Sequence, residues 1–123
     1  MNSQETRTFF IKYINTCNLA LRRHKDGLPY KQIIELGNKV LGGKNVIAKI
    51  YVDDLNQPVD AYTVRFNDGT IDVVSYDEEE AEHEWNLRES YIETVVQNSD
   101  DYIAHPEKLE WDWLKSRLQI GNE

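Results

Sequence analysis

The stretch AYTVRFNDGTIDVVSY, residues 61–76, carries the clearest indication of the fold. On both sides of the segment NDG, residues 67–69, apolar and polar side chains alternate with the two-residue period of a half-buried strand. A segment of this composition favours the tight turn that joins two antiparallel strands. These residues therefore predict a β-hairpin with its turn at 67–69.

The segment VIAKIYV, residues 46–52, alternates in the same way and supplies a third strand. Together the three strands predict an antiparallel meander with one apolar face, onto which helices can pack. The other face is expected to be half-solvated, because it carries four polar side chains: Lys49, Thr63, Arg65 and Asp72.

Two amphipathic segments precede the strands. Residues 5–27 place their apolar side chains in one sector of a helical wheel, and the cations of the last turn complement the helix dipole. Residues 28–43 carry a second apolar stripe, with Pro29 in the first turn and two glycines as terminator. Gly37 lies within that stripe, where its missing side chain would let the two helices approach closely.

Two or three helices are expected after the strands. Ser90 and Glu93 have the spacing of a capping box, which predicts a helix from Tyr91. A short helical turn follows within residues 98–106, and a last helix is expected from Pro106 to Ile120. The predicted fold class is α+β: two N-terminal helices, a three-stranded antiparallel β-meander, then two to three C-terminal helices packed on the sheet. Residues 1–123 are expected to form a single domain.

The composition argues against several classes of partner. Lys and Arg number 14 against 22 Asp and Glu, and a net charge of −8 repels phosphate backbones, so we expect no direct nucleic-acid binding. No stretch approaches the roughly 20 apolar residues that span a bilayer, and the start of the chain lacks the pattern of a secretory leader. We therefore expect no membrane contact and a cytoplasmic location, where the single cysteine, Cys17, stays reduced.

The segment YDEEEAEHEW, residues 76–85, concentrates negative charge. Six carboxylates lie within it: Asp77, Glu78, Glu79, Glu80, Glu82 and Glu84. Like charges four residues apart disfavour a helix, so we expect an exposed connection that is either a solvated loop or a docking site for a basic partner. Glu79 or Glu80 could face His83, as in a dimetal carboxylate site, but no second such pair follows and we expect no metal.

Two tryptophans in HPEKLEWDWLKSRLQIG, residues 105–121, pose a choice between core and contact surface. Leu109, Trp111 and Trp113 also alternate as a strand would, but the flanking residues favour a helix. On a helix the two indoles point about 200° apart, because each residue turns the chain by about 100°, and the apolar residues form two stripes. Either the domain covers both stripes internally, or a partner or second copy covers the stripe of Trp113, whose indole Arg117 can overlie.

Catalytic chemistry has little support in the sequence. Cys17 and His24 would lie on one helix roughly 10 Å apart along its axis, too far to share a hydrogen bond. We expect a packed thiol and a helix-terminal cation instead. The common nucleophile, phosphate-loop, zinc-protease and dinucleotide-binding motifs do not occur. We therefore predict no catalytic residues and no cofactor.

Two hypotheses about function follow. The first is a non-enzymatic protein-interaction module, a small acidic adaptor or inhibitor that presents a carboxylate cluster and an aromatic helix face to a basic protein partner. Its partner-binding residues would be Glu78, Glu79, Glu80, Glu82, Glu84, Trp113 and Arg117, and the last helix would also support a homodimer. The alternative is a small-ligand-binding protein or enzyme that uses a cleft between helices and sheet.

Overall fold

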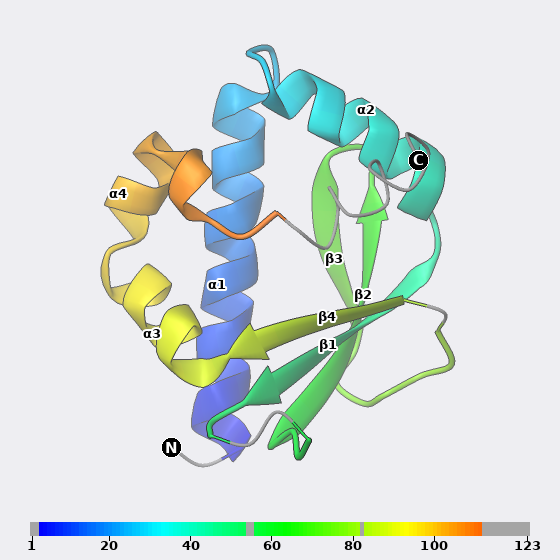
Figure 1. The fold of residues 1–123 in the computed structure, drawn as a ribbon, viewed down its shortest axis with the longest axis vertical. Coiled ribbons are helices and arrows are strands. Elements are labelled where there is room, and N and C mark those ends of the chain that lie inside the picture. The colour runs from blue at the N-terminus through cyan, green and yellow to red at the C-terminus, as the bar shows by residue number, and fades with distance from the viewer. Residues whose placement is uncertain (1–2, 54–55, 82, 112–123) are drawn as a thin grey trace.

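A computed structural model of the chain describes residues 3–53, 56–81 and 83–111. Helices α1 and α2 precede a sheet of four strands, and short helices follow it (Figure 1). The elements in chain order are α1 (Ser3–His24), α2 (Tyr30–Leu41), β1 (Asn45–Tyr51), β2 (Asp60–Asn67), β3 (Thr70–Ser75), β4 (His83–Arg88), α3 (Glu89–Gln97), α4 (Ser99–Ala104) and the 3₁₀ helix η1 (Pro106–Lys108). The α+β class and the two N-terminal helices are confirmed.

The sheet is mixed, with strand order β3-β2-β1-β4. Strands β1, β2 and β3 form the predicted antiparallel meander, but β4 adds a fourth strand that runs parallel to β1. The prediction of a three-stranded sheet was therefore wrong. Trp85 and Leu87 are buried on β4 while Glu84 and Asn86 are exposed, so this strand has the ordinary alternation of a half-buried strand inside an acidic segment.

The β2–β3 turn has the predicted geometry. Asp68 and Gly69 are the two residues between the strands, and their φ angles are 50° and 79°. Two consecutive positive φ angles match a type I′ turn, whose twist suits the strands that it joins. The turn sets the register that pairs Phe66 with Ile71.

The core lies between α1 and one face of the sheet. Helix α1 also contacts α3 and α4, which lie along it in Figure 1. The ring of Phe10 stacks on that of Tyr62 at 4.7 Å between centroids, and Tyr13 contacts both Trp85 and Tyr91. The predicted apolar face of the first helix is thus the core face.

Helix α3 begins at Glu89, directly after β4, rather than at Tyr91. The residue before it, Arg88, is extended, and no side chain caps the helix. The predicted capping box of Ser90 and Glu93 is therefore not formed, because the strand leads straight into the helix and Ser90 lies inside the first turn.

The predicted last helix is wrong over residues 106–111. Only Pro106–Lys108 form a 3₁₀ turn, and Leu109 is extended with ψ 153°. Leu109 and Trp111 are buried on either side of exposed Glu110, and the Trp111 indole N–H donates to the Pro106 carbonyl at 2.8 Å. Trp113, Arg117 and the remainder of that predicted helix lie outside the described residues.

Candidate functional site

Residues 77–81, which we call the acidic strap, lie in the connection between the two edge strands of the sheet, β3 and β4. Strand β3 is at one edge and β4 at the other, three strand spacings or about 14 Å away. The connection between Ser75 and His83 is long enough to cross this distance, since extended chain advances about 3.3 Å per residue. Figure 1 shows it as the yellow-green loop that leads into β4.

Hydrogen bonds from the sheet hold the acidic strap in place. The Thr63 hydroxyl donates to the Asp77 carbonyl at 2.8 Å and accepts from the Glu79 amide at 2.9 Å. The Asn45 side-chain amide donates to the Glu80 carbonyl at 3.1 Å, and Asn45 itself accepts from Arg65 Nε at 2.7 Å. The strap is therefore an irregular segment attached to β1 and β2, not a loose connection.

The strap covers the face of the sheet that is opposite α1, which we call the outer face. Ile47 points to this face and is paired with Thr63 on β2 and Glu84 on β4. It is only 3% exposed although it is not part of the core under α1. Thr63, expected to be half-solvated, is fully buried because the strap lies over it.

The predicted partner-binding glutamates separate into three groups. Glu78, Glu79 and Glu80 are exposed on the strap. Glu84 lies on β4 and forms an ion pair with Lys49 at 2.7 Å. Glu82 lies outside the described residues. The predicted cluster therefore reduces to three exposed carboxylates beside one that is already paired.

The negative charges of Glu84 and of the strap act on the ammonium group of Lys49, on the outer face of the sheet. Its hydrogen bond to Glu84 raises the pKa of Lys49 above the usual value, and the nearby charge of Glu78 raises it further. Lys49 therefore stays protonated at neutral pH and neutralises part of the local negative field. Beside the strap, Lys44, Arg65 and Glu80 contribute to the wall of a cavity of about 430 Å³.

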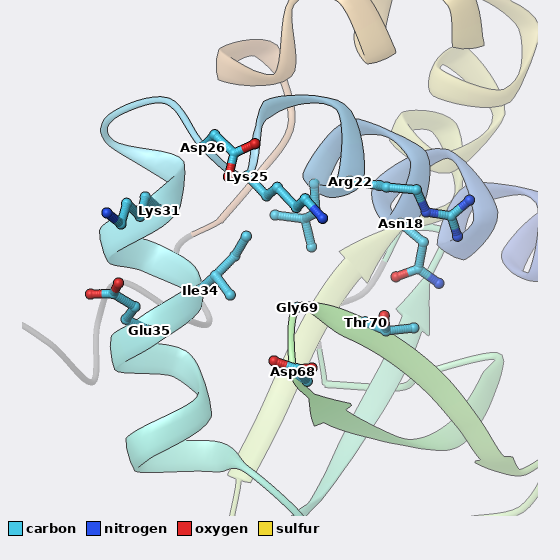
Figure 2. A pocket seen from close by; sticks show the side chains of 11 residues that line it. Asn18, Arg22, Lys25, Asp26, Lys31, Ile34, Glu35, Asp68, Gly69 and Thr70 are labelled. Carbon is cyan, nitrogen blue, oxygen red and sulfur yellow. The ribbon is translucent and has the colours of Figure 1, made fainter.

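A second cavity, of about 450 Å³, opens where α1, α2 and the β2–β3 turn meet (Figure 2). We call it the helix–turn cleft. It is lined by Asn18, Leu21, Arg22, Lys25, Asp26, Lys31, Ile34, Glu35, Asp68, Gly69 and Thr70. The alternative hypothesis expected a cleft between helices and sheet, but the sequence did not indicate these residues as the lining of one.

Hydrogen bonds and close packing join the three walls of this cleft. The Asn18 side chain donates to the Ile71 carbonyl at 2.9 Å and accepts from the Ile71 amide at 2.7 Å, which ties α1 to β3. The Gly69 amide donates to Asn38 Oδ1 at 3.3 Å, which ties the turn to α2. A Cβ at Gly69 would lie 3.3 Å from Ile34 Cγ2, so the turn packs closely against α2.

Cys17 is buried among aromatic rings and has the properties of a packed thiol. Burial raises its pKa from the usual 9.0 to about 12, so the thiol is neutral at physiological pH. The His24 ring lies 3.0 Å from the Ile103 carbonyl and contacts Tyr30. Within residues 3–53, 56–81 and 83–111, no group of three or more His, Cys, Asp or Glu side chains has the geometry to hold a metal ion.

Comparisons of this chain with protein-family models, with curated proteins and with solved structures found no match. Within the part of the chain that the structure describes, no helix is long and apolar enough to cross a membrane.

Proposed function

We propose that this protein is a non-enzymatic interaction module, an adaptor or inhibitor, that docks a basic protein partner on its acidic strap. One observation carries the proposal: Glu78, Glu79 and Glu80 are exposed on a backbone segment that Thr63 and Asn45 attach to the sheet. Their carboxylates therefore project from a fixed base rather than from an unattached loop.

A fixed base matters because a partner that binds a mobile loop must first order it. Ordering costs conformational entropy and weakens binding, whereas a preorganised surface avoids most of that cost. Clustered exposed charge also accelerates the encounter with a partner of opposite sign, and the net charge of −8 acts in the same direction. The strap is suited to selecting a basic surface.

Glu84 has a different role in this proposal. Because it is paired with Lys49, a partner that used Glu84 would have to compete with an existing ion pair. The carboxylates of Glu78, Glu79 and Glu80 are therefore the main contacts. Binding through Trp113 and Arg117, and self-association through the last helix, stay predictions because both residues lie outside the described residues.

Affinity capture with matched variants tests the proposal. The strap variant carries Glu78→Gln, Glu79→Gln and Glu80→Gln. A matched helix-side variant carries Glu93→Gln, Asp100→Asn and Glu107→Gln on α3, α4 and η1. It loses the same charge from elements that follow the end of β4, whereas the strap leads into the start of β4 (Figure 1). We expect a basic protein to be captured at low salt by the wild type and the helix-side variant but not by the strap variant. Equal capture by all three, or an acidic captured protein, would contradict the proposal.

A further inference from the structure

We propose that the helix–turn cleft binds a small zwitterion of the free amino acid type. This site is separate from the acidic strap and does not depend on it. Its volume of about 450 Å³ lies in the range of small-molecule sites, which are commonly about 300 to 1,000 Å³. Its walls are tied together through Asn18 and Asn38, so the cavity exists before any ligand enters.

The charges of the cleft are balanced and unpaired. Three cations (Arg22, Lys25 and Lys31) and three carboxylates (Asp26, Glu35 and Asp68) line it. Among the described residues, none of these six side chains forms an ion pair or a side-chain hydrogen bond with another. Both signs of charge are thus available to a ligand.

The arrangement of these side chains indicates which chemical groups a ligand must have. Figure 2 shows Lys25, the residue after α1, reaching over the cavity, with Asp68 on the β2–β3 turn across from it. Ile34 points toward the cavity from α2 and supplies apolar surface, while Leu21 lies fully buried in the wall behind the lining. A carboxylate would bind at Lys25, an ammonium at Asp68, and a short carbon skeleton would contact Ile34.

The charge balance also discriminates between ligand classes. A polyanion such as phosphate would meet the three carboxylates and the field of a chain with net charge −8. A zwitterion has no net charge and avoids that repulsion, while each of its ends finds an oppositely charged group. The cleft therefore favours a zwitterion over an anion of similar size.

Titration of the intact protein with each common amino acid alone, and with inorganic phosphate, tests the inference. We expect at least one amino acid to bind more tightly than phosphate, with a dissociation constant measured by calorimetry or ligand-observed NMR. The same compound without its amino group, or without its carboxylate, should bind at least about tenfold more weakly, since each lost charge-assisted contact has that effect.

Two variants locate the site. Asp68→Asn removes the carboxylate and keeps a residue that tolerates the positive φ of 50° at this position. Lys25→Met removes the ammonium and keeps a chain of similar length. Each should weaken binding about tenfold, whereas Lys39→Met, on α2 but outside the cavity lining, should bind as the wild type does.

The inference is overturned if no amino acid binds, if phosphate binds more tightly, or if both cleft variants retain wild-type affinity. The strap variant should bind the amino acid normally. The two proposals can therefore fail separately: partner capture by the strap variant tests only the strap, and amino acid binding by the cleft variants tests only the cleft.

Discussion

The hydroxyl of Thr63 accepts a hydrogen bond from the Glu79 amide at 2.9 Å and is fully buried in doing so. The same hydroxyl donates to Asp77, so one side chain satisfies two backbone groups of the acidic strap. Thr63 thus attaches the charged segment to the middle of the sheet.

Thr63→Val should lower the free energy of unfolding by about 1 to 3 kcal/mol, because it leaves two backbone groups of the strap without their partner. Urea denaturation measures the change. Thr8→Val is the control, since the exposed Thr8 hydroxyl bonds only to the Gln4 carbonyl of α1 among the described residues. Equal effects of the two substitutions would show that Thr63 does not anchor the strap.

Asn18→Ala should destabilise the protein by about 2 kcal/mol, because the Ile71 amide and carbonyl both lose their partner at the sheet edge. The Ile71 amide should also exchange with solvent faster, which hydrogen-exchange NMR measures. Asn38→Ala, which removes a single bond at 3.3 Å, should have a smaller effect. Unchanged exchange at Ile71 would contradict the role given to Asn18.

Gly69→Ala should cost more stability than Gly43→Ala. Both glycines have a positive φ, of 79° and 75°, so an added Cβ strains the two backbones similarly, by about 1 to 2 kcal/mol. At Gly69 the new Cβ would also press against Ile34 at 3.3 Å, whereas at Gly43 no atom of the described residues beyond its chain neighbours lies within 4 Å. Thermal denaturation of the two variants gives the difference, and equal losses would mean that the turn does not pack on α2 as described.

The protein should lose stability in alkaline solution. Burial raises the pKa of Cys17 from 9.0 to about 12 and that of Tyr91 from 10.0 to about 12, and it also raises the pKa of Tyr13. The unfolded chain therefore releases these protons at lower pH than the folded one, so the free energy of unfolding falls as pH rises above about 9 and continues to fall until about pH 12.

Cys17→Ala tests how much the thiol contributes to this loss of stability at high pH. The substitution should lower stability at neutral pH by about 1 to 2 kcal/mol through lost packing, and it should make the decline between pH 9 and 11 shallower. Urea denaturation at a series of pH values measures both effects. A variant that declines as steeply as the wild type would show that the thiol does not contribute.

The elements that the sequence predicted correctly are those with local patterns. The alternation around Asp68 and Gly69 predicts the hairpin because both strands and the turn lie in one short segment. Helices α1 and α2 follow from apolar periodicity in the same way. These features need no knowledge of distant residues.

Strand β4 and the acidic strap were missed because distant contacts determine them. Trp85 and Leu87 alternate with polar residues, but the surrounding glutamates suggested a solvated segment, and the pairing with β1 joins residues far apart in the chain. From the alternation of its strand, Thr63 is predicted to be an ordinary half-solvated polar residue on the outer face of the sheet. Only the path of the strap across that face buries it.

The helix–turn cleft was missed for the same reason. Asn18 and Ile71 are 53 residues apart, and nothing near either residue indicates that they pair. The sequence predicts Arg22 and Lys25 to be cations that complement the dipole at the end of a helix. It predicts Asp68 to be a residue of the hairpin turn. Their common position around one cavity follows from the packing of α1 and α2 on the turn.

The association rate of the captured partner, measured by stopped flow at about 0.01 M and about 1 M salt, tests the role of the strap most directly. Screening lengths at these concentrations are about 30 Å and 3 Å, so electrostatic steering acts only at the lower one. We expect fast, strongly salt-dependent association for the wild type and the helix-side variant, and slow, nearly salt-independent association for the strap variant. Equal slowing in both triple variants would show that net charge alone steers the partner, and no slowing in the strap variant would show that the strap is only solvated surface.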